Sequence, residues 1–272
     1  MSTVETIWRP LAGAIADKRA ALGRPALIGV SGPQGCGKST GCVLLSEIFA
    51  REGLRCATVS LDDFYRTKAE RAALAATIHP LFATRGPPGT HDVALGEATT
   101  ARLLAGESFA PPRFAKARDD RAPERDWPRF EGPADIVILE GWCVGAEPQP
   151  AEALATPVNA LEREEDPQGV WRAYANAALE HYARWFDTLD FRIHFRAPDF
   201  AIVKSWRLEQ EQTLRADRGD AAGQSYMTAP QIDRFVQHYE RWTRAMDEGA
   251  ASPADAVIQL GSVRELVSFT LR

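Results

Sequence analysis

A glycine-rich stretch followed by a lysine and a serine has the composition of a phosphate-binding site. Gly32, Gly37, Lys38 and Ser39 have the spacing G-x-x-x-x-G-K-[ST], between an apolar run and a helical pattern. Glycines let successive backbone N–H groups turn toward phosphate oxygens, and the start of a helix adds partial positive charge. The lysine then reaches the β- and γ-phosphates, and the serine hydroxyl is a ligand for Mg²⁺. The expected nucleotide contacts are Gly32, Pro33, Gln34, Gly35, Cys36, Gly37, Lys38, Ser39 and Thr40.

Acidic residues follow two other apolar runs that have the length of buried strands. Asp62 and Asp63 come after residues 56–61, and Glu140 closes residues 135–140. The carboxyl ends of parallel strands share one edge of a sheet, so we expect these acids beside the phosphate-binding loop. In phosphate-loop proteins a carboxylate at the end of the strand next to the first one holds the Mg²⁺ shell, and Glu140 has that place. An ordinary surface turn, or an acid that merely ends a strand, would give the same pattern.

The apolar runs alternate with helical patterns along the chain, which predicts a parallel sheet with right-handed crossovers. The expected strands are residues 26–30, 56–61, 135–140 and 191–195, the expected helices are 4–22, 40–51, 66–80, 93–104, 170–185, 200–214 and 230–246, and β segments at 256–260 and 263–271 follow. The fold class is therefore α/β: a P-loop NTPase with three layers, α/β/α, a central, mostly parallel sheet and a helical lid. We expect a single domain over residues 1–272.

Three segments between these elements lack a clear pattern. Residues 109–131 carry two short strand-like pieces, 113–115 and 127–130, which predict a hairpin projecting over the site. Residues 144–168 show no periodicity and are expected to form a long loop. The lid region, residues 207–226, breaks into glycine and charge toward its end, which suits either a lid that closes on phosphates or a solvated turn.

The composition limits the partners of the chain. Its 272 residues carry a net charge of −5, so it lacks the basic excess that attracts nucleic acid or an anionic membrane, and a small molecule is the expected partner. Its four cysteines form no C-x-x-C pair, and we find no secretory leader or long apolar run, which favours a cytoplasmic location. Cys36 could act as a redox switch or simply fill the phosphate loop.

The order of these motifs resembles the glycerate kinase branch of the uridine kinase, phosphoribulokinase and pantothenate kinase group. The phosphate loop is followed by Leu61-Asp-Asp-Phe-Tyr65, by Arg85-Gly-Pro-Pro-Gly-Thr-His-Asp92 and by Ile138-Leu-Glu-Gly-Trp142, and the likeness spans roughly residues 25–245. The resemblance implies an ATP-dependent kinase that uses Mg²⁺ and phosphorylates a hydroxyl of a small metabolite, with D-glycerate as the first expectation.

The resemblance also implies roles for single residues. Asp62 would accept the proton of the acceptor hydroxyl, Asp92 would contact substrate hydroxyls, and Glu140 would take the metal-shell position. Arg207, Arg215 or Arg218 would supply the cation of the lid. The expected catalytic residues are Lys38, Asp62, Glu140 and Arg215, the expected metal ligands are Ser39 and Glu140, and the expected substrate contacts are Asp62, Tyr65, Arg85, His91, Asp92 and Lys116.

D-Glycerate is a small carboxylate, so a cation should hold it. The first candidates for this cation are Arg85 and Lys116, and the second candidates are Arg66 and Lys68. Where plant-type relatives read Pro-Arg-Tyr-Asp-Lys-Ser, this chain reads Pro112-Arg-Phe-Ala-Lys-Ala117. The loss of the tyrosine hydroxyl, the aspartate carboxylate and the serine hydroxyl bears on the substrate rather than on the type of reaction.

Other functions stay open at this point. The acceptor could be a nucleoside or a pantothenate-like alcohol, and a nucleotide-binding regulator without catalysis would also carry the phosphate loop. A GTPase switch is disfavoured, because the chain has no N-K-x-D guanine reader and its D-x-x-G match, Asp220-Ala-Ala-Gly223, follows an expected helix rather than a strand.

Overall fold

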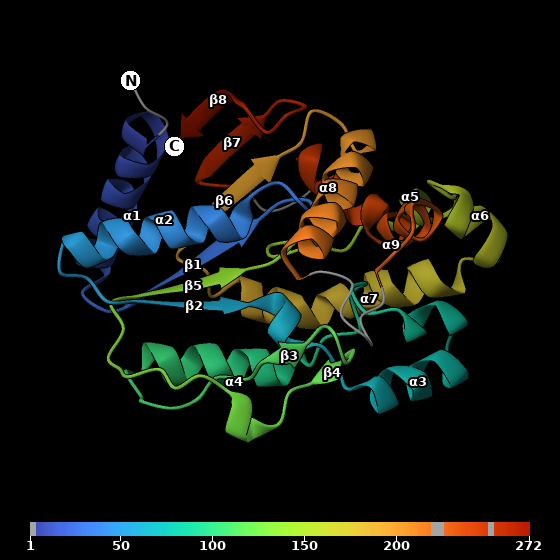
Figure 1. Cartoon of the computed structure of the whole chain (residues 1–272), viewed down its shortest axis with the longest axis horizontal. Coiled ribbons are helices and arrows are strands. Elements are labelled where there is room, and N and C mark those ends of the chain that lie inside the picture. The colour runs from blue at the N-terminus through green and yellow to red at the C-terminus, as the bar shows by residue number, and fades with distance from the viewer. Residues whose placement is uncertain (1–3, 219–225, 250–252) are drawn as a thin grey trace.

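Six strands build one central sheet, in the order β2-β5-β1-β6-β7-β8, in this computed structural model (Figure 1). The structure describes residues 4–218, 226–249 and 253–272. Neighbouring strands run parallel from β2 to β7, and β8 runs antiparallel to β7. The strands are β1 (Ala26–Ser31), β2 (Cys56–Ser60), β5 (Ile136–Glu140), β6 (Phe191–Arg196), β7 (Ala256–Leu260) and β8 (Leu266–Leu271). The predicted α/β fold with a mostly parallel sheet is confirmed.

Helices cover both faces of this sheet and complete the three layers. α1 (Arg9–Leu22) and α2 (Lys38–Arg51) lie on one face, and α4 (Val93–Leu104) and α7 (Val170–Phe186) lie on the other (Figure 1). None of the helices in the part of the chain that the structure describes has an apolar stretch long enough to cross a bilayer. Shorter elements connect these strands and helices. They include η1 (Val4–Trp8), η2 (Leu61–Phe64), α3 (Lys68–Thr77), η3 (Pro80–Ala83) and η4 (Glu124–Asp126).

Successive side chains of each central strand enter two different cores. Leu27 packs in the core with α4 and α7, whereas Ile28 beside it packs in the core with α1 and α2. Val137 and Ile138 divide in the same way on β5. Because neighbouring residues of a strand point to opposite faces, a sheet covered on both faces buries all of them. This explains why the strands are continuous apolar runs in the sequence.

Two long helices, α8 (Ala201–Arg218) and α9 (Ala229–Asp247), pack against each other at the carboxyl-end side of the strands (Figure 1). A small separate core that includes Val203 and Ile232 joins them. α8 continues to Arg218, past the predicted end at residue 214. Residues 219–225 of the predicted lid, including the whole stretch Asp220-Ala-Ala-Gly223, lie outside the described residues.

The predicted hairpin exists, but its second strand was placed wrongly. β3 (Phe114–Ala115) pairs with β4 (Asp120–Arg121), and residues 127–130 are not its partner. The reversal is tight because Asp119 adopts a φ of 52°, a conformation in which aspartate is tolerated better than most residues. The return strand therefore begins directly after the turn.

The expectation of a structureless loop over residues 144–168 is also wrong. The segment contains two short helices, α5 (Ala151–Leu154) and α6 (Ala160–Glu165). Glu162 of α6 accepts a hydrogen bond from Arg241 of α9 at 2.5 Å, and both side chains are buried. Helices this short are not stable on their own, so contacts with the rest of the protein stabilise them and leave no periodic pattern.

The packing of α4 on α7 gives a testable prediction. Gly96 faces the ring of Trp185, and a Cβ at this position would overlap the ring. Trp185 is buried and its Nε1 donates to the Thr100 hydroxyl, so the ring has little freedom to move. We expect Gly96→Ala to lower the free energy of unfolding by about 1–3 kcal/mol.

The matched control is Gly13→Ala in α1, where a Cβ would meet nothing within 4 Å. This variant should be more stable by about 0.5–1 kcal/mol, because alanine loses less backbone entropy in a helix. Urea unfolding of both variants checks the pair, and equal stability of Gly96→Ala and the wild type would contradict the packing described here.

Candidate active site

The turn from β1 into α2 has the backbone of a phosphate-binding loop. Gly32, Gly35 and Gly37 have φ angles of 146°, 77° and 95°, values that residues with a side chain rarely adopt. A Cβ at Gly35 would also lie 2.8 Å from the Cβ of Trp206 on α8. α2 begins at Lys38 with no side-chain cap, so its first backbone N–H groups can receive an anion.

Two cations hold the carbonyl groups of this loop. Lys38 Nζ donates to the carbonyl oxygens of Gly32 at 2.7 Å and of Pro33 at 2.9 Å. Arg264, between β7 and β8, donates through Nε to the carbonyl oxygen of Gly35 at 2.6 Å. These bonds fix the orientations of the loop peptides. Sequence reasoning missed Arg264 because it lies more than two hundred residues away along the chain.

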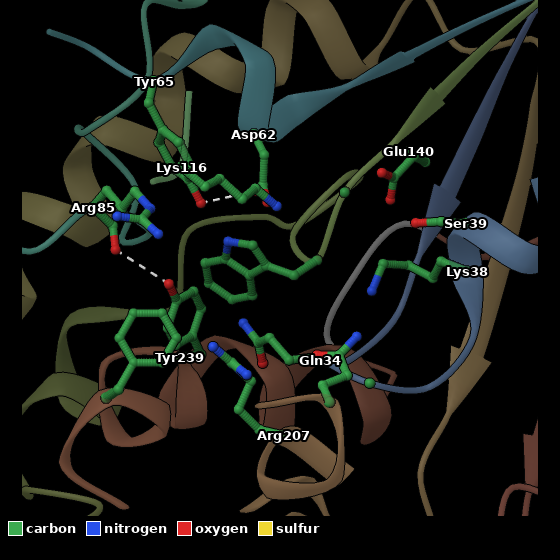
Figure 2. A pocket seen from close by; sticks show the side chains of 15 residues that line it. Gln34, Lys38, Ser39, Asp62, Tyr65, Arg85, Lys116, Glu140, Arg207 and Tyr239 are labelled. Carbon is green, nitrogen blue, oxygen red and sulfur yellow. Dashed lines mark hydrogen bonds and ion pairs between the residues drawn. The ribbon is translucent and has the colours of Figure 1, made fainter. Parts of the chain in front are cut away.

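A cavity of about 350 Å³ opens where the loop meets the ends of β2 and β5 (Figure 2). It brings together residues from the loop, from both strand ends, from the hairpin and from α8 and α9. The lining residues are Gln34, Gly35, Lys38, Ser39, Asp62, Tyr65, Arg85, Lys116, Glu140, Gly141, Trp142, Arg207, Gln210, Phe235 and Tyr239. Nine of the residues expected from the sequence to act in catalysis or binding are among them, in addition to Arg207 from the lid region.

Asp62 is one of the two carboxylates that line this cavity. Its Oδ1 accepts a hydrogen bond from the Tyr65 hydroxyl at 2.8 Å, and its Oδ2 accepts one from Lys116 Nζ at 2.6 Å. Burial by itself would raise the pKa of Asp62, but the charge of Lys116 and the two hydrogen bonds outweigh it and lower the pKa to about 2. Asp62 is therefore ionised at neutral pH and can accept a proton.

Asp63 has a different task from its neighbour. Its carboxylate accepts hydrogen bonds from Arg113 Nη1 at 2.6 Å and from the backbone N–H of Phe114 at 3.1 Å. It therefore anchors the hairpin that carries Lys116, while Asp62 receives Lys116 in the cavity. Of the two adjacent acids, Asp62 therefore lines the cavity and Asp63 holds the hairpin in place.

Glu140 and Ser39 supply oxygen ligands to the same cavity (Figure 2). In the sheet, Glu140 is in register with Val30 of β1 on one side and with Ser60 of β2 on the other, so these strand ends lie level. Among the described residues, no group of three or more His, Cys, Asp and Glu side chains could hold a metal ion by itself. One carboxylate and one hydroxyl suit Mg²⁺, which commonly completes its shell with water and phosphate oxygens.

Arg85 and Arg207 add positive charge to the cavity from two different elements. Arg85 Nη1 pairs with Asp119 of the hairpin turn at 2.5 Å, and Arg207 of α8 pairs with Glu211 at 2.6 Å. Arg215 lies farther along α8 and is not among the lining residues. Of the two arginines, the structure thus brings Arg207 rather than Arg215 into this cavity.

His91 and Asp92 lie outside this cavity and line a neighbouring one of about 370 Å³. The His91 Nδ1 forms a hydrogen bond with the Tyr182 hydroxyl at 2.8 Å, and its ring stacks on Tyr65 with 4.5 Å between centroids. Burial lowers the pKa of His91 to about 3, so the ring is neutral at physiological pH. Asp92 caps α4 by accepting a hydrogen bond from the backbone N–H of Leu95 at 3.1 Å. The structure therefore places His91 against the ring of Tyr65 but outside the cavity that Tyr65 lines, and Asp92 at the start of α4 as its cap.

Three other expected contacts also lie away from the cavity. Arg66 donates through Nε to the carbonyl oxygen of Gly89 and lines the neighbouring cavity, and Lys68 is exposed at the start of α3. Cys36 is buried inside the loop, and this burial raises the pKa of its thiol although Lys38 lowers it in part. A protonated, buried thiol is a poor nucleophile, which favours the interpretation of Cys36 as a small filler of the loop.

The structure adds aromatic residues that the sequence analysis did not assign to the site. Tyr239 donates its hydroxyl hydrogen to the carbonyl oxygen of Arg85 at 3.1 Å, and the Trp142 ring meets the Tyr239 ring edge-on at 4.9 Å. Phe235 and Tyr239 are four residues apart in α9, a spacing that in the sequence favours a core face over a binding site. Trp142 could have been found, because it stands two residues after the expected metal ligand Glu140.

The known proteins that are similar to this chain carry the names of kinases. Residues 27–147 match the model of the Phosphoribulokinase / Uridine kinase family. The D-glycerate 3-kinase, chloroplastic, of Arabidopsis thaliana is 33% identical over 226 residues, a match that covers 79% of this chain and 46% of that protein. This chain therefore spans about half the length of that relative.

Two further relatives match over nearly their whole length. The uncharacterized kinase mug58 of Schizosaccharomyces pombe is 32% identical over 250 residues, covering 88% of this chain and 87% of that protein. The structure of a D-glycerate 3-kinase from Cryptococcus neoformans var. grubii is similar with a TM-score of 0.80 and 26% identity, covering 97% of this chain and 98% of that chain.

The contact between Lys116 and Asp62 predicts a measurable change in pKa. In Lys116→Met the burial of Asp62 remains while the charge that lowers its pKa is removed, so the pKa of Asp62 should rise above about 2. Carboxyl-carbon NMR titration of the folded protein checks this. Arg118→Met is the matched control, because Arg118 is exposed in the same turn and does not line the cavity. An Asp62 that titrates identically in the wild type and in Lys116→Met would contradict the contact.

The sign of the pH dependence follows from the same pair. The pKa of Asp62 is lower in the folded chain than its ordinary value of 3.8, so the pair stabilises the fold above that value and stops doing so as pH falls toward 2. The Lys116 side chain is 61% exposed, so solvent screens the pair and the contribution should stay below about 1 kcal/mol.

Proposed function

The chain belongs to the Phosphoribulokinase / Uridine kinase family, and on that premise we propose that it transfers the γ-phosphoryl group of ATP to a hydroxyl of D-glycerate. The observation that carries the proposal is the convergence of Lys38, Asp62 and Glu140 on one cavity. Phosphoryl transfer needs mainly positioning and neutralisation of charge. These residues offer a cation for the phosphates, a carboxylate for the hydroxyl and a ligand for a metal ion.

The loop and the start of α2 would hold the phosphates of ATP. Lys38 Nζ, which bonds to two loop carbonyls, would exchange them for phosphate oxygens, because charged acceptors form stronger hydrogen bonds. Arg207 lines the cavity from α8 and would add a second cation. Ser39 and Glu140 would hold Mg²⁺, which neutralises charge on the phosphate oxygens when it is bound.

Asp62 would accept the proton of the acceptor hydroxyl as its oxygen attacks the γ-phosphorus. The carboxylate of the acceptor needs a cation nearby, and Lys116 and Arg85 line the same cavity as Asp62. D-Glycerate combines a hydroxyl and a carboxylate in one small molecule, and two of the relatives carry the name of its kinase. These points support D-glycerate over a neutral alcohol.

A panel of acceptors tests the substrate directly. We expect release of ADP from Mg-ATP with D-glycerate, and rates about a hundredfold lower with uridine, pantothenate and ribulose 5-phosphate, whose larger bodies do not match a site for a small hydroxy acid. Coupled detection of ADP measures all four. Faster turnover of uridine or pantothenate would replace D-glycerate as the acceptor, and tight ATP binding without any product would indicate a regulator.

A substitution of Asp62 tests the role of the base. Asp62→Asn should lower kcat by about 10²–10⁴-fold, because the amide cannot accept the proton, and should leave the affinity for ATP unchanged in calorimetry. Lys38→Ala is the contrasting variant and should weaken ATP binding instead. An Asp62→Asn enzyme that keeps more than about a tenth of kcat would refute the role of Asp62.

A further inference from the structure

Both oxygens of the Asp62 carboxylate have a donor within the protein. Tyr65 donates to Oδ1 from the same short turn, and Lys116 donates to Oδ2 from the hairpin. An acceptor hydroxyl must hand its proton to this carboxylate. An ammonium group at 2.6 Å competes for the same oxygen and lowers its affinity for a proton. The arrangement with Lys116 on Asp62 therefore holds the base in a weakly basic form.

The hairpin that carries Lys116 is firmly anchored. Its ion pairs include those of Arg71 and Arg85 with Asp119, of Arg113 with Asp63, and of Arg121 with Asp92. Arg71 is almost completely buried, and the guanidinium carbons of Arg71 and Arg85 lie 5.6 and 5.7 Å from the centre of the Phe114 ring. The Lys116 side chain, by contrast, is 61% exposed and has four rotatable bonds. The side chain can therefore move to a new partner while the hairpin stays in place.

Arg85 and Lys116 together favour the binding of an anion in the cavity. Arg85 lines the same cavity, and its positive charge repels that of Lys116. This repulsion lowers the pKa of Lys116, but the larger effect of the Asp62 charge raises it. A carboxylate placed between Lys116 and Arg85 would relieve this repulsion and compete with Asp62 for the ammonium. A neutral alcohol would offer no such competition.

We propose that Lys116 makes catalysis conditional on an anionic acceptor: it restrains Asp62 until the acid group of the acceptor draws the ammonium away. This inference rests on the proposed kinase activity and adds to it the means by which the site selects a hydroxy acid over a neutral polyol, which is the contact of Lys116 with Asp62. The acceptor oxygen then forms a bond to the γ-phosphorus, and the bond from that phosphorus to the bridging oxygen breaks, leaving its electron pair on ADP. The hydroxyl proton passes to Asp62 and from there to solvent.

The same restraint protects ATP from water. Without an anionic acceptor Lys116 stays on Asp62, so a water molecule in the cavity meets a weak base. Removal of the ammonium should therefore increase hydrolysis of ATP in the absence of any acceptor.

Acceptor-independent hydrolysis is the decisive measurement. ADP release from Mg-ATP alone should rise about tenfold in Lys116→Met, a part of the 10²–10⁴-fold that a positioned base can supply, and should not change in Arg118→Met. The double variant Asp62→Asn/Lys116→Met should lose the increase, because the effect acts through Asp62. A rate in Lys116→Met equal to or below that of the wild type would overturn the proposal, and so would an increase that survives in the double variant.

A second arm separates this proposal from the identity of the acceptor. The wild type should prefer D-glycerate to its neutral methyl ester by about a hundredfold in kcat/KM, and Lys116→Met should reduce that preference at least tenfold. A wild type that phosphorylates neither compound would overturn D-glycerate as the acceptor, while the hydrolysis comparison still decides the role of Lys116. A preference that is unchanged in Lys116→Met would overturn the restraint by Lys116.

Discussion

The turn between β1 and α2 is the constraint on which the rest of the site depends. Its glycines adopt φ angles that other residues avoid, and the helix that follows begins without a side-chain cap. Parallel pairing then aligns the ends of the neighbouring strands with the start of this turn, because Glu140 is in register with Val30 and with Ser60. Three segments far apart in the sequence thus end at one edge of the sheet, and Lys38, Asp62 and Glu140 line one cavity.

Charge in the cavity is balanced by contacts behind it. The lining residues include four cations, Lys38, Arg85, Lys116 and Arg207, against two acids. Each arginine is paired with an acid outside the lining, Asp119 or Glu211, which holds the guanidinium in place. A preorganised cluster of cations suits a polyanionic ligand and the charge that develops during phosphoryl transfer. The lysines instead bond to groups that a ligand can replace: backbone carbonyls for Lys38 and Asp62 for Lys116.

Features that depend on neighbouring residues could be predicted from the sequence, and features that depend on distant contacts could not. The phosphate loop, the strand-end acids and the order of strands and helices each leave a local pattern, and the structure agrees with them. The partner of β3 was missed because a single aspartate with positive φ shortens the turn. α6 was missed because its stability comes from the buried pair of Glu162 with Arg241. Likewise, only the packed fold shows that Arg207, rather than Arg215, reaches the cavity.

One measurement tests the central claim most directly: a crystal structure with a non-hydrolysable ATP analogue, Mg²⁺ and D-glycerate. The account predicts phosphate oxygens within hydrogen-bond distance of Lys38 Nζ and an acceptor hydroxyl between Asp62 and the γ-phosphorus, with the acceptor carboxylate near Lys116 and Arg85. D-Glycerate bound in the neighbouring cavity beside His91 and Asp92, with its hydroxyls out of reach of Asp62, would contradict it.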